Sequence, residues 1–252
     1  MDYKKYVKWG KWPTTWCPGC AIGVVFKQLV FTLEAEKIPK NELVVVSGIG
    51  CSGRAAGYFA VDSVHGTHGR AIPIAEGIKR ANPRLKVIVF SGDGDLVGIG
   101  GNHLLHSSRR NIDLTVICIN NEIYGMTGGQ MAPTTKHESR TLTSVHGNPY
   151  QPLNIQGLIS SNPSHFYGRT SSYQINHLRK VMAQALKWEG FSFLDVISYC
   201  IENNGRRQGF KSPYEMLVKI KQDYRINAKP EGLLGPNELG VVSHEFQESP
   251  KD

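Results

Sequence analysis

Four of the five cysteines in this chain stand where thiolates could do chemistry. Cys17 and Cys20 enclose a Pro-Gly pair in the stretch TTWCPGC, and Cys51 and Cys200 occur further along the chain. A C-x-x-C pair can act as a redox dithiol, hold zinc, or supply half of the ligands of an iron–sulfur cluster. The local sequence leaves all three chemistries open.

Oxygen-bearing side chains form a second candidate site. Asp93 lies between two glycines in SGDGD, and Asn121 directly follows the next apolar run, DLTVICIN. Glycines ahead of a helix let backbone N–H groups approach a phosphate, although Asp-Gly is also a common turn. A carboxylate, an amide and a nearby carbonyl oxygen suit Mg²⁺, which keeps diphosphate oxygens as partners. The pair therefore predicts a site for Mg²⁺ and a diphosphate.

The elements that must position these residues alternate between strand and helix patterns. Short β-branched runs predict strands, covered on both faces, at 43–50, 86–94, 113–120 and 192–198. Apolar residues at helical spacing predict helices at 21–36, 98–110, 175–188 and 212–224. The alternation predicts an α/β fold with a mostly parallel sheet and helices on both faces. Because ligands bind at the carboxyl ends of such strands, we expect one edge of the sheet to carry Cys51, Asp93, Asn121 and Cys200.

Two regions lack a clear pattern. Residues 127–172 are rich in Thr, Ser, Gly, Pro and His, and we interpret them as a long functional or partner-covered loop region. The last twenty-odd residues suggest an arm or tail. We therefore expect a cofactor-binding domain over 1–205 and a C-terminal extension over 206–252 that packs on this domain or on a partner.

The remaining cysteine and several histidines have simpler interpretations. Cys118 lies between two isoleucines within an expected strand, which is typical of a small buried apolar side chain. His103 and His106 would share one helix face, where hydrogen-bonded side chains are common. His68, which stands beside Arg70 in a glycine-containing loop, is the better candidate for contact with a substrate.

Composition bounds the partners and the compartment. The chain of 252 residues has 29 Lys and Arg against 21 Asp and Glu, a formal charge of +8. This balance suits an acidic protein or a phosphorylated ligand, whereas nucleic acid is disfavoured because no basic–aromatic run or DNA-binding motif occurs. The first residues lack the apolar core of a signal peptide, and no run is long enough to cross a bilayer. We expect a cytoplasmic protein with reduced cysteines and no membrane partner.

Five motifs in order resemble the β subunit of the 2-oxoacid:ferredoxin oxidoreductases. They are CPGC, VSGIGCSGR, THGRAIPIAEGIKRANP, GDGDLVGIGG and INNEIYGMTGGQMAPTT. The resemblance runs from about residue 16 to residue 135, with a weaker echo near Cys200. It implies a thiamin diphosphate-binding (pyrophosphate-type) α/β domain.

The resemblance assigns the metal ligands. It implies that Mg²⁺ is bound by Asp93, Asn121 and the backbone carbonyl of Ile123. It also implies that one [4Fe–4S] cluster is held by Cys17, Cys20, Cys51 and Cys200. The family's last cysteine usually follows Ser-Pro, whereas Cys200 follows Ser-Tyr.

The resemblance also implies which residues surround the organic cofactor. His68 and Arg70 would lie near its reactive end and act in catalysis. The residues expected to line thiamin diphosphate are Gly50, Ser52, Gly53, Arg54, His68, Gly92, Asp93, Gly94, Asp95, Asn121, Ile123, Tyr124, Gly125, Met126 and Thr127.

The implied reaction is oxidative decarboxylation of a 2-oxoacid. Coenzyme A would accept the acyl group, CO₂ would leave, and electrons would pass through the cluster to ferredoxin. Overall likeness favours 2-oxoglutarate over pyruvate and other 2-oxoacids as the substrate. In the family, the glutamate that activates thiamin belongs to the α subunit, and no context marks Glu76, Glu122 or Glu138 for that role. We therefore expect a heteromer with an α subunit, and with γ or δ subunits where the complex has them, that is inactive without its partner.

Two other functions fit parts of the sequence. One is a zinc-stabilised α/β binding module without catalysis, and the other is a non-oxidative thiamin-dependent decarboxylase. A protein of either kind would carry no iron–sulfur cluster, so the brown colour of such a cluster separates both from the first interpretation.

Overall fold

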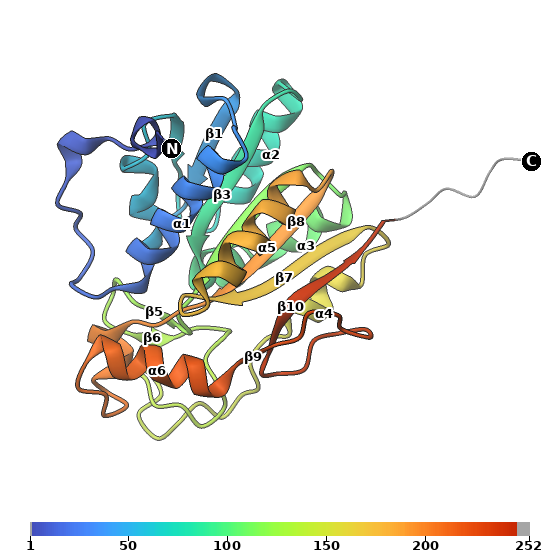
Figure 1. Ribbon diagram of the computed structural model, residues 1–252. Helices are drawn as coiled ribbons and strands as arrows, with labels where there is room; N and C mark the ends of the chain where they lie inside the picture. The colour runs from blue at the N-terminus through green and yellow to red at the C-terminus, as the bar shows by residue number, and fades with distance from the viewer. Residues whose placement is uncertain (1, 246–252) are drawn as a thin grey trace, which may run out of the picture.

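One eight-stranded sheet forms the centre of the molecule (Figure 1). The computed structural model describes residues 2–245. The strands follow the spatial order β2-β1-β3-β4-β8-β7-β10-β9. Their bounds are β1 Leu43–Ser47, β2 Asp62–His65, β3 Lys86–Gly92, β4 Leu114–Asn120, β7 His165–Ser171, β8 Phe191–Ile197, β9 Arg225–Ile226 and β10 Glu238–His244.

The strands from β2 to β7 in that order all pair in parallel. β10 is antiparallel to β7, and β9 is parallel to β10. A separate antiparallel pair joins β5 (Ile123–Tyr124) to β6 (Gln130–Met131). The prediction of a mostly parallel α/β sheet is confirmed.

Helices cover both faces of the sheet. α1 (Ala21–Ala35) and α5 (Ile175–Lys187) pack on one face, and the other carries α2 (Ala71–Ala81), α3 (Gly101–Arg109) and α4 (Ile155–Ser160). α6 (Pro213–Asp223) packs with the end of β8 in a third apolar cluster. None of these helices, within residues 2–245, combines the length and the apolar composition that a bilayer crossing requires.

Alternation along the strands divides the core into two layers. Ile88 and Phe90 of β3 pack with α1 and α5, whereas Val87 and Val89 pack with α2 and α3. This follows from the two-residue period of side chains in a strand. Cys118 of β4 lies in the second layer and is 0% exposed, which confirms its interpretation as a small buried apolar residue.

The structure corrects the two regions that lacked a pattern. α4 and β7 lie within 127–172, so the interpretation of that whole region as a loop is wrong. The interpretation of the C-terminal part as an arm or tail is also wrong for β10, which pairs with β7 from His165 to Arg169. Part of the expected extension thus shares a sheet with the expected first domain. The residues from 246 onward lie outside the described part of the chain.

The expected helix at 98–110 has two parts. A π-helix spans Gly94–Ile99, and the α-helix begins only at Gly101. A second π-helix spans Ile201–Gly205. Because π-helical turns are rare and occur frequently at functional sites, their positions directly after Asp93 and Cys200 single out these two strand ends.

Candidate functional site

The four residues expected at one edge of the sheet do meet there. β1, β3, β4 and β8 are consecutive in the sheet, and all run in parallel. Cys51, Asp93, Asn121 and Cys200 follow the carboxyl ends of these strands in the same order. Because these strands are parallel, their carboxyl ends bring thiol, carboxylate and amide groups to the same edge of the sheet.

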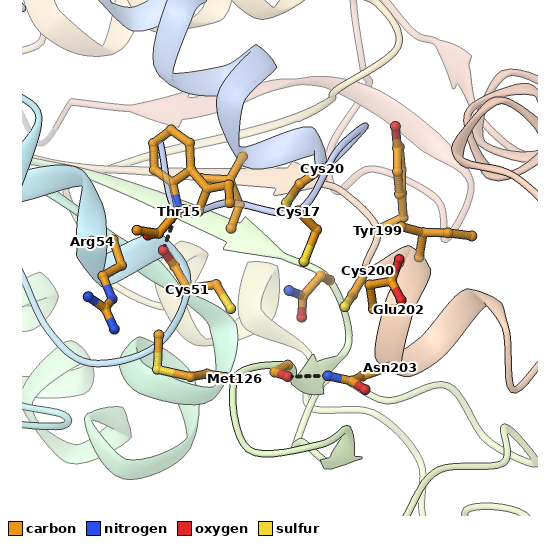
Figure 2. Close-up of a pocket in the computed structure, with 15 residues that line it drawn as sticks. Thr15, Cys17, Cys20, Cys51, Arg54, Met126, Tyr199, Cys200, Glu202 and Asn203 are labelled. Carbon is orange, nitrogen blue, oxygen red and sulfur yellow. Dashed lines mark hydrogen bonds between the residues drawn. The ribbon is translucent and has the colours of Figure 1, made fainter. Parts of the chain in front are cut away.

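Cys17, Cys20, Cys51 and Cys200 line one cavity of about 250 Å³, here called the cysteine cavity. Figure 2 shows them around a common space, reached from the segment before α1, from the turn after β1 and from the end of β8. Within residues 2–245, no three His, Cys, Asp or Glu side chains gather closely enough to hold a single metal ion. Thiolates around one zinc ion lie about 4 Å apart, because each Zn–S bond is about 2.3 Å long. Four thiols around one cavity are the ligand set of a [4Fe–4S] cluster, and four thiolates can also hold one zinc ion.

The turn between the first two cysteines is fixed from several sides. The backbone N–H of Cys20 donates to the carbonyl of Cys17 over 3.0 Å, and the hydroxyl of Tyr199 donates to the carbonyl of Gly19 over 3.0 Å. Gly19 has a φ of +76°, and a Cβ there would lie 2.5 Å from the Pro213 ring. Only glycine fits this position, so contacts within the protein alone fix the turn between the two cysteines.

Burial controls the protonation of these thiols. Burial, together with the neighbouring thiol groups of Cys200, Cys51 and Cys17, raises the pKa of Cys20 to about 12. Burial also raises the pKa of Cys51 and of Cys200. Since metals bind the thiolate form, any metal that entered this cavity would displace protons.

A second cavity of about 80 Å³ adjoins the first and surrounds Asp93; it is here called the Asp93 cavity. All of the residues predicted to contact thiamin diphosphate line it except Gly53 and Arg54, and Ile49 and Cys51 line it in addition. Gly53 is buried, and a side chain there would collide with the carbonyl of Gly48. Arg54 lines the cysteine cavity instead.

The Asp93 carboxylate has the surroundings of a metal ligand. It is 1% exposed, and burial raises its pKa to about 7. The N–H of Asn121 donates to one oxygen over 3.4 Å, and the Thr134 hydroxyl donates to the other. The side-chain oxygen of Asn121 accepts from the N–H of Ile123 over 3.3 Å. Hydrogen bonds therefore connect the three predicted Mg²⁺ ligands, which lie on the two neighbouring loops after β3 and β4. A bound cation would offset the cost of burying this charge.

Gly94 shows why the phosphate side of this cavity needs a residue without a side chain. A Cβ at Gly94 would lie 2.5 Å from the ring of Tyr124. Its backbone begins the π-helix that follows Asp93. N–H groups at such a helix start can approach an anion, which fits a diphosphate beside the magnesium ligands.

Asp95 lines the same cavity but uses its carboxylate within the protein. It accepts from the hydroxyl of Ser91 at 2.8 Å and from the N–H groups of Ile49 at 3.1 Å and Gly69 at 2.7 Å. It also bonds to Nδ1 of His68 at 2.6 Å. Asp95 therefore joins three loops and orients His68, whose half-buried ring lies in the cavity wall.

Arg70 lies apart from His68 despite their closeness in sequence. It is exposed at the start of α2, and its guanidinium donates to the carbonyl of Gly69 over 3.3 Å. Neither cavity includes it in its lining. The catalytic role of Arg70 therefore remains a prediction without a structural contact to support it.

Three consecutive residues of the poorly patterned region hold Asp93 and Glu122 in place, and the sequence alone did not predict them. Thr134 donates to Asp93, and the Thr135 hydroxyl donates to the carbonyl of Glu122 over 2.5 Å. Nζ of Lys136 pairs with the Glu122 carboxylate at 3.1 Å. The only available signal was that the stretch resembling the family ends at these threonines.

None of Glu76, Glu122 and Glu138 lies where it could activate thiamin in the Asp93 cavity. Glu76 accepts hydrogen bonds from Arg80, Ser107 and Arg110 between α2 and α3. Glu122 pairs with Lys136, and Glu138 is exposed. Among the described residues, no glutamate lines the Asp93 cavity.

Comparison with known proteins agrees with this arrangement. Residues 48–196 match the family described as "Thiamine pyrophosphate enzyme, C-terminal TPP binding domain". The chain is 40% identical over 251 residues to the 2-oxoglutarate synthase subunit KorB of Methanothermobacter marburgensis, covering 99% of this chain and 88% of that protein. It is 41% identical over 188 residues to the 2-oxoacid:ferredoxin oxidoreductase subunit beta of Saccharolobus solfataricus. That match covers 73% of this chain and 61% of the Saccharolobus protein.

A solved structure has the same fold over nearly the whole chain. It is the 2-oxoglutarate:ferredoxin oxidoreductase from Magnetococcus marinus with 2-oxoglutarate, coenzyme A and succinyl-CoA bound. The TM-score is 0.84 at 26% identity, over 99% of this chain and 86% of that one. The chain belongs to the β subunits of the thiamin diphosphate-dependent 2-oxoacid:ferredoxin oxidoreductases.

Proposed function

We propose that this subunit binds thiamin diphosphate with Mg²⁺ in the Asp93 cavity and a [4Fe–4S] cluster in the cysteine cavity. With an α subunit it converts a 2-oxoacid and coenzyme A to acyl-CoA and CO₂, and ferredoxin takes the electrons. The observation that carries this proposal is a shared wall: Cys51, Asn121, Gly125 and Met126 line both cavities. An organic cofactor and a redox cluster would therefore be direct neighbours.

The residues of this chain would divide the work. Bound thiamin diphosphate supplies the electron sink that decarboxylation of a 2-oxoacid needs. Asp93, Asn121 and the Ile123 carbonyl hold Mg²⁺, and the backbone around Gly94 receives the diphosphate. His68, oriented by Asp95, stands in the cavity wall, where its ring can form a hydrogen bond with a substrate and position it.

The chain supplies only part of the active site. Ligand pockets are usually about 300–1,000 Å³ in volume, whereas the Asp93 cavity measures about 80 Å³. The lack of a lining glutamate within the described residues points the same way. Both observations support an α subunit that closes the site and supplies the missing group, with γ or δ subunits where the complex has them.

2-Oxoglutarate is the substrate we propose. The names of the KorB relatives and the ligands of the Magnetococcus structure support it. The complex would work in the cytoplasm, where thiols stay reduced and can receive iron.

The first test uses the separated subunit. We expect the purified chain with thiamin diphosphate, Mg²⁺, 2-oxoglutarate and coenzyme A to form no succinyl-CoA, because the pyrimidine-activating group is missing. Addition of the α subunit should restore formation of succinyl-CoA and reduction of a low-potential dye. Robust turnover by the lone chain would contradict the proposal of a split site.

The second test removes one proposed cluster ligand. Cys17→Ser should abolish the brown colour and the bound iron of the anaerobically purified complex, while Mg²⁺–thiamin diphosphate still binds, because Cys17 lines only the cysteine cavity. Cys118→Ala is the matched control, since that thiol is buried within the sheet, and it should retain its iron. A colourless wild-type complex that contains zinc would favour the binding module, and release of an aldehyde without coenzyme A would favour the non-oxidative decarboxylase.

A further inference from the structure

The segment ahead of the first cysteines presents an exposed surface that is both aromatic and basic. Trp9 is 48% and Trp12 is 42% exposed, and their rings stack with centroids 5.7 Å apart. Lys4, Lys8 and Lys11 are exposed around them, and within residues 2–245 none of these three forms an ion pair. We call these five residues the Trp–Lys face. In Figure 1 its dark-blue segment runs along the outside of the molecule before α1 begins.

This face is rigidly attached although it is exposed. The N–H of Lys8 donates to the carbonyl of Tyr58 over 2.9 Å, and the N–H of Ala60 donates to the carbonyl of Tyr6 over 2.7 Å. The indole N–H of Trp9 donates to the carbonyl of Lys4 over 3.1 Å. Two exposed tryptophans beside lysines without ion pairs are typical of a surface that a partner covers. Trp is among the residues most enriched in the hot spots of protein interfaces.

Aromatic rings connect the face to the cysteine cavity. Trp12 lies 6.4 Å from Tyr58, and Tyr58 lies 5.0 Å from Trp16, measured between ring centroids. Trp16 lines the cysteine cavity, and its indole N–H donates to the carbonyl of Cys51 over 2.7 Å. The Trp–Lys face and the cavity wall are therefore one continuous structure, and a partner seated on the face would lie beside the proposed cluster.

We infer that the Trp–Lys face docks the acidic redox protein that accepts electrons from this subunit. The inference rests on the proposed function, which places a cluster in the cysteine cavity. Lysines without ion pairs attract an acidic partner at long range, and the stacked indoles supply the buried contact once it arrives. A permanent subunit interface would be more apolar and depleted in lysine, so the composition of the face favours a transient partner over the α subunit.

The experiment compares charge reversals in the assembled complex. Lys8→Glu/Lys11→Glu should weaken the binding of an acidic ferredoxin, and raise its KM, at least about tenfold, with a flatter dependence on salt. Trp9→Ala should weaken binding while the salt dependence is retained. In both variants, the iron content and the reduction of a small viologen dye with 2-oxoglutarate should match the parent complex.

The matched control is Arg84→Glu/Arg109→Glu, which changes the charge equally at two exposed positions after α2 and at the end of α3. It should leave ferredoxin binding unchanged. Unchanged ferredoxin affinity in both face variants, or their failure to assemble with the α subunit, would overturn the inference. If the unmodified complex reduced no dye and held no iron, the proposed function itself would be wrong. The docking inference, which rests on that function, would then be wrong as well.

Discussion

At the scale of single residues, the burial of Asp93 makes two separable predictions. For a carboxyl group, a pKa raised to about 7 in the folded chain means that the folded state favours the protonated form. Without a cation, this group therefore costs stability progressively as the pH rises from about 4, the unfolded value, to about 7. Binding of Mg²⁺ would reverse that cost.

Asp93→Asn removes the charge and nearly preserves the shape. We expect the unloaded chain to be as resistant to urea as the parent at pH 8, or more so, while its complex binds Mg²⁺–thiamin diphosphate at least about 100-fold more weakly. Isothermal titration and urea denaturation measure the two effects. Asp113→Asn is the control, since Asp113 pairs with Lys79 and Lys86 away from both cavities. Unchanged cofactor affinity in Asp93→Asn would remove Asp93 from the metal site.

Residues that follow predicted strands could be placed from the sequence, and residues that reach the site from elsewhere could not. Asp93 and Asn121 were predictable because parallel strands end at the same edge. The Thr134 hydroxyl reaches Asp93 across 41 positions of sequence, a contact that only the folded loop creates. Arg70 is close to His68 in sequence but lies at the start of α2 and does not line the cavity that His68 lines, so its catalytic role stays a prediction.

At the scale of elements, the strands with clear apolar runs were predictable and the others were not. β7 contains the fully buried polar residues Thr170 and Ser171, and β10 has a glycine at Gly240. Both are held by pairing with neighbouring strands, β7 with β8 and β10, and β10 with β7 and β9, which local composition does not report. α2 was missed because it contains Pro73, which is tolerated in a first helical turn, where its missing N–H would have no partner.

Glu76 fixes α2 to α3 and gives a prediction at this scale. Burial alone would raise its pKa, but hydrogen bonds from Arg110, Ser107 and Arg80 and the charge of Arg110 lower it to about 2. Glu76→Gln should therefore cost about 1–3 kcal/mol of unfolding free energy at pH 7. Because the folded pKa is depressed, the difference should narrow below pH 4.5, the unfolded value, and vanish towards pH 2.

Urea denaturation at pH 7, 4.5 and 3.5 measures this trend. Glu138→Gln, in an exposed loop, is the control and should change little at any of these pH values. A destabilisation by Glu76→Gln that stayed constant down to pH 3.5 would show that the charge of Glu76 does not join the two helices.

At the scale of the whole molecule, the C-terminal strand completes the core near the site. Leu239 of β10 is 0% exposed and packs in one cluster with Ala21, which follows Cys20, and with Tyr199, which precedes Cys200. Leu239→Ala should cost about 2–5 kcal/mol and lower the iron content of the complex. Leu233→Ala, at a position 57% exposed, should change neither. Equal urea midpoints for the two variants would mean that β10 is not part of the core.

If the cysteine cavity holds the proposed cluster, the wall that it shares with the Asp93 cavity also links the damage that oxygen would do to the two sites. Cys51 lines both spaces, so loss of iron from one side would free a residue in the wall of the other. Oxidation of this thiol would therefore affect more than electron transfer, because it would also change the shape of the Asp93 cavity. Repair of such a subunit would then have to restore both sites.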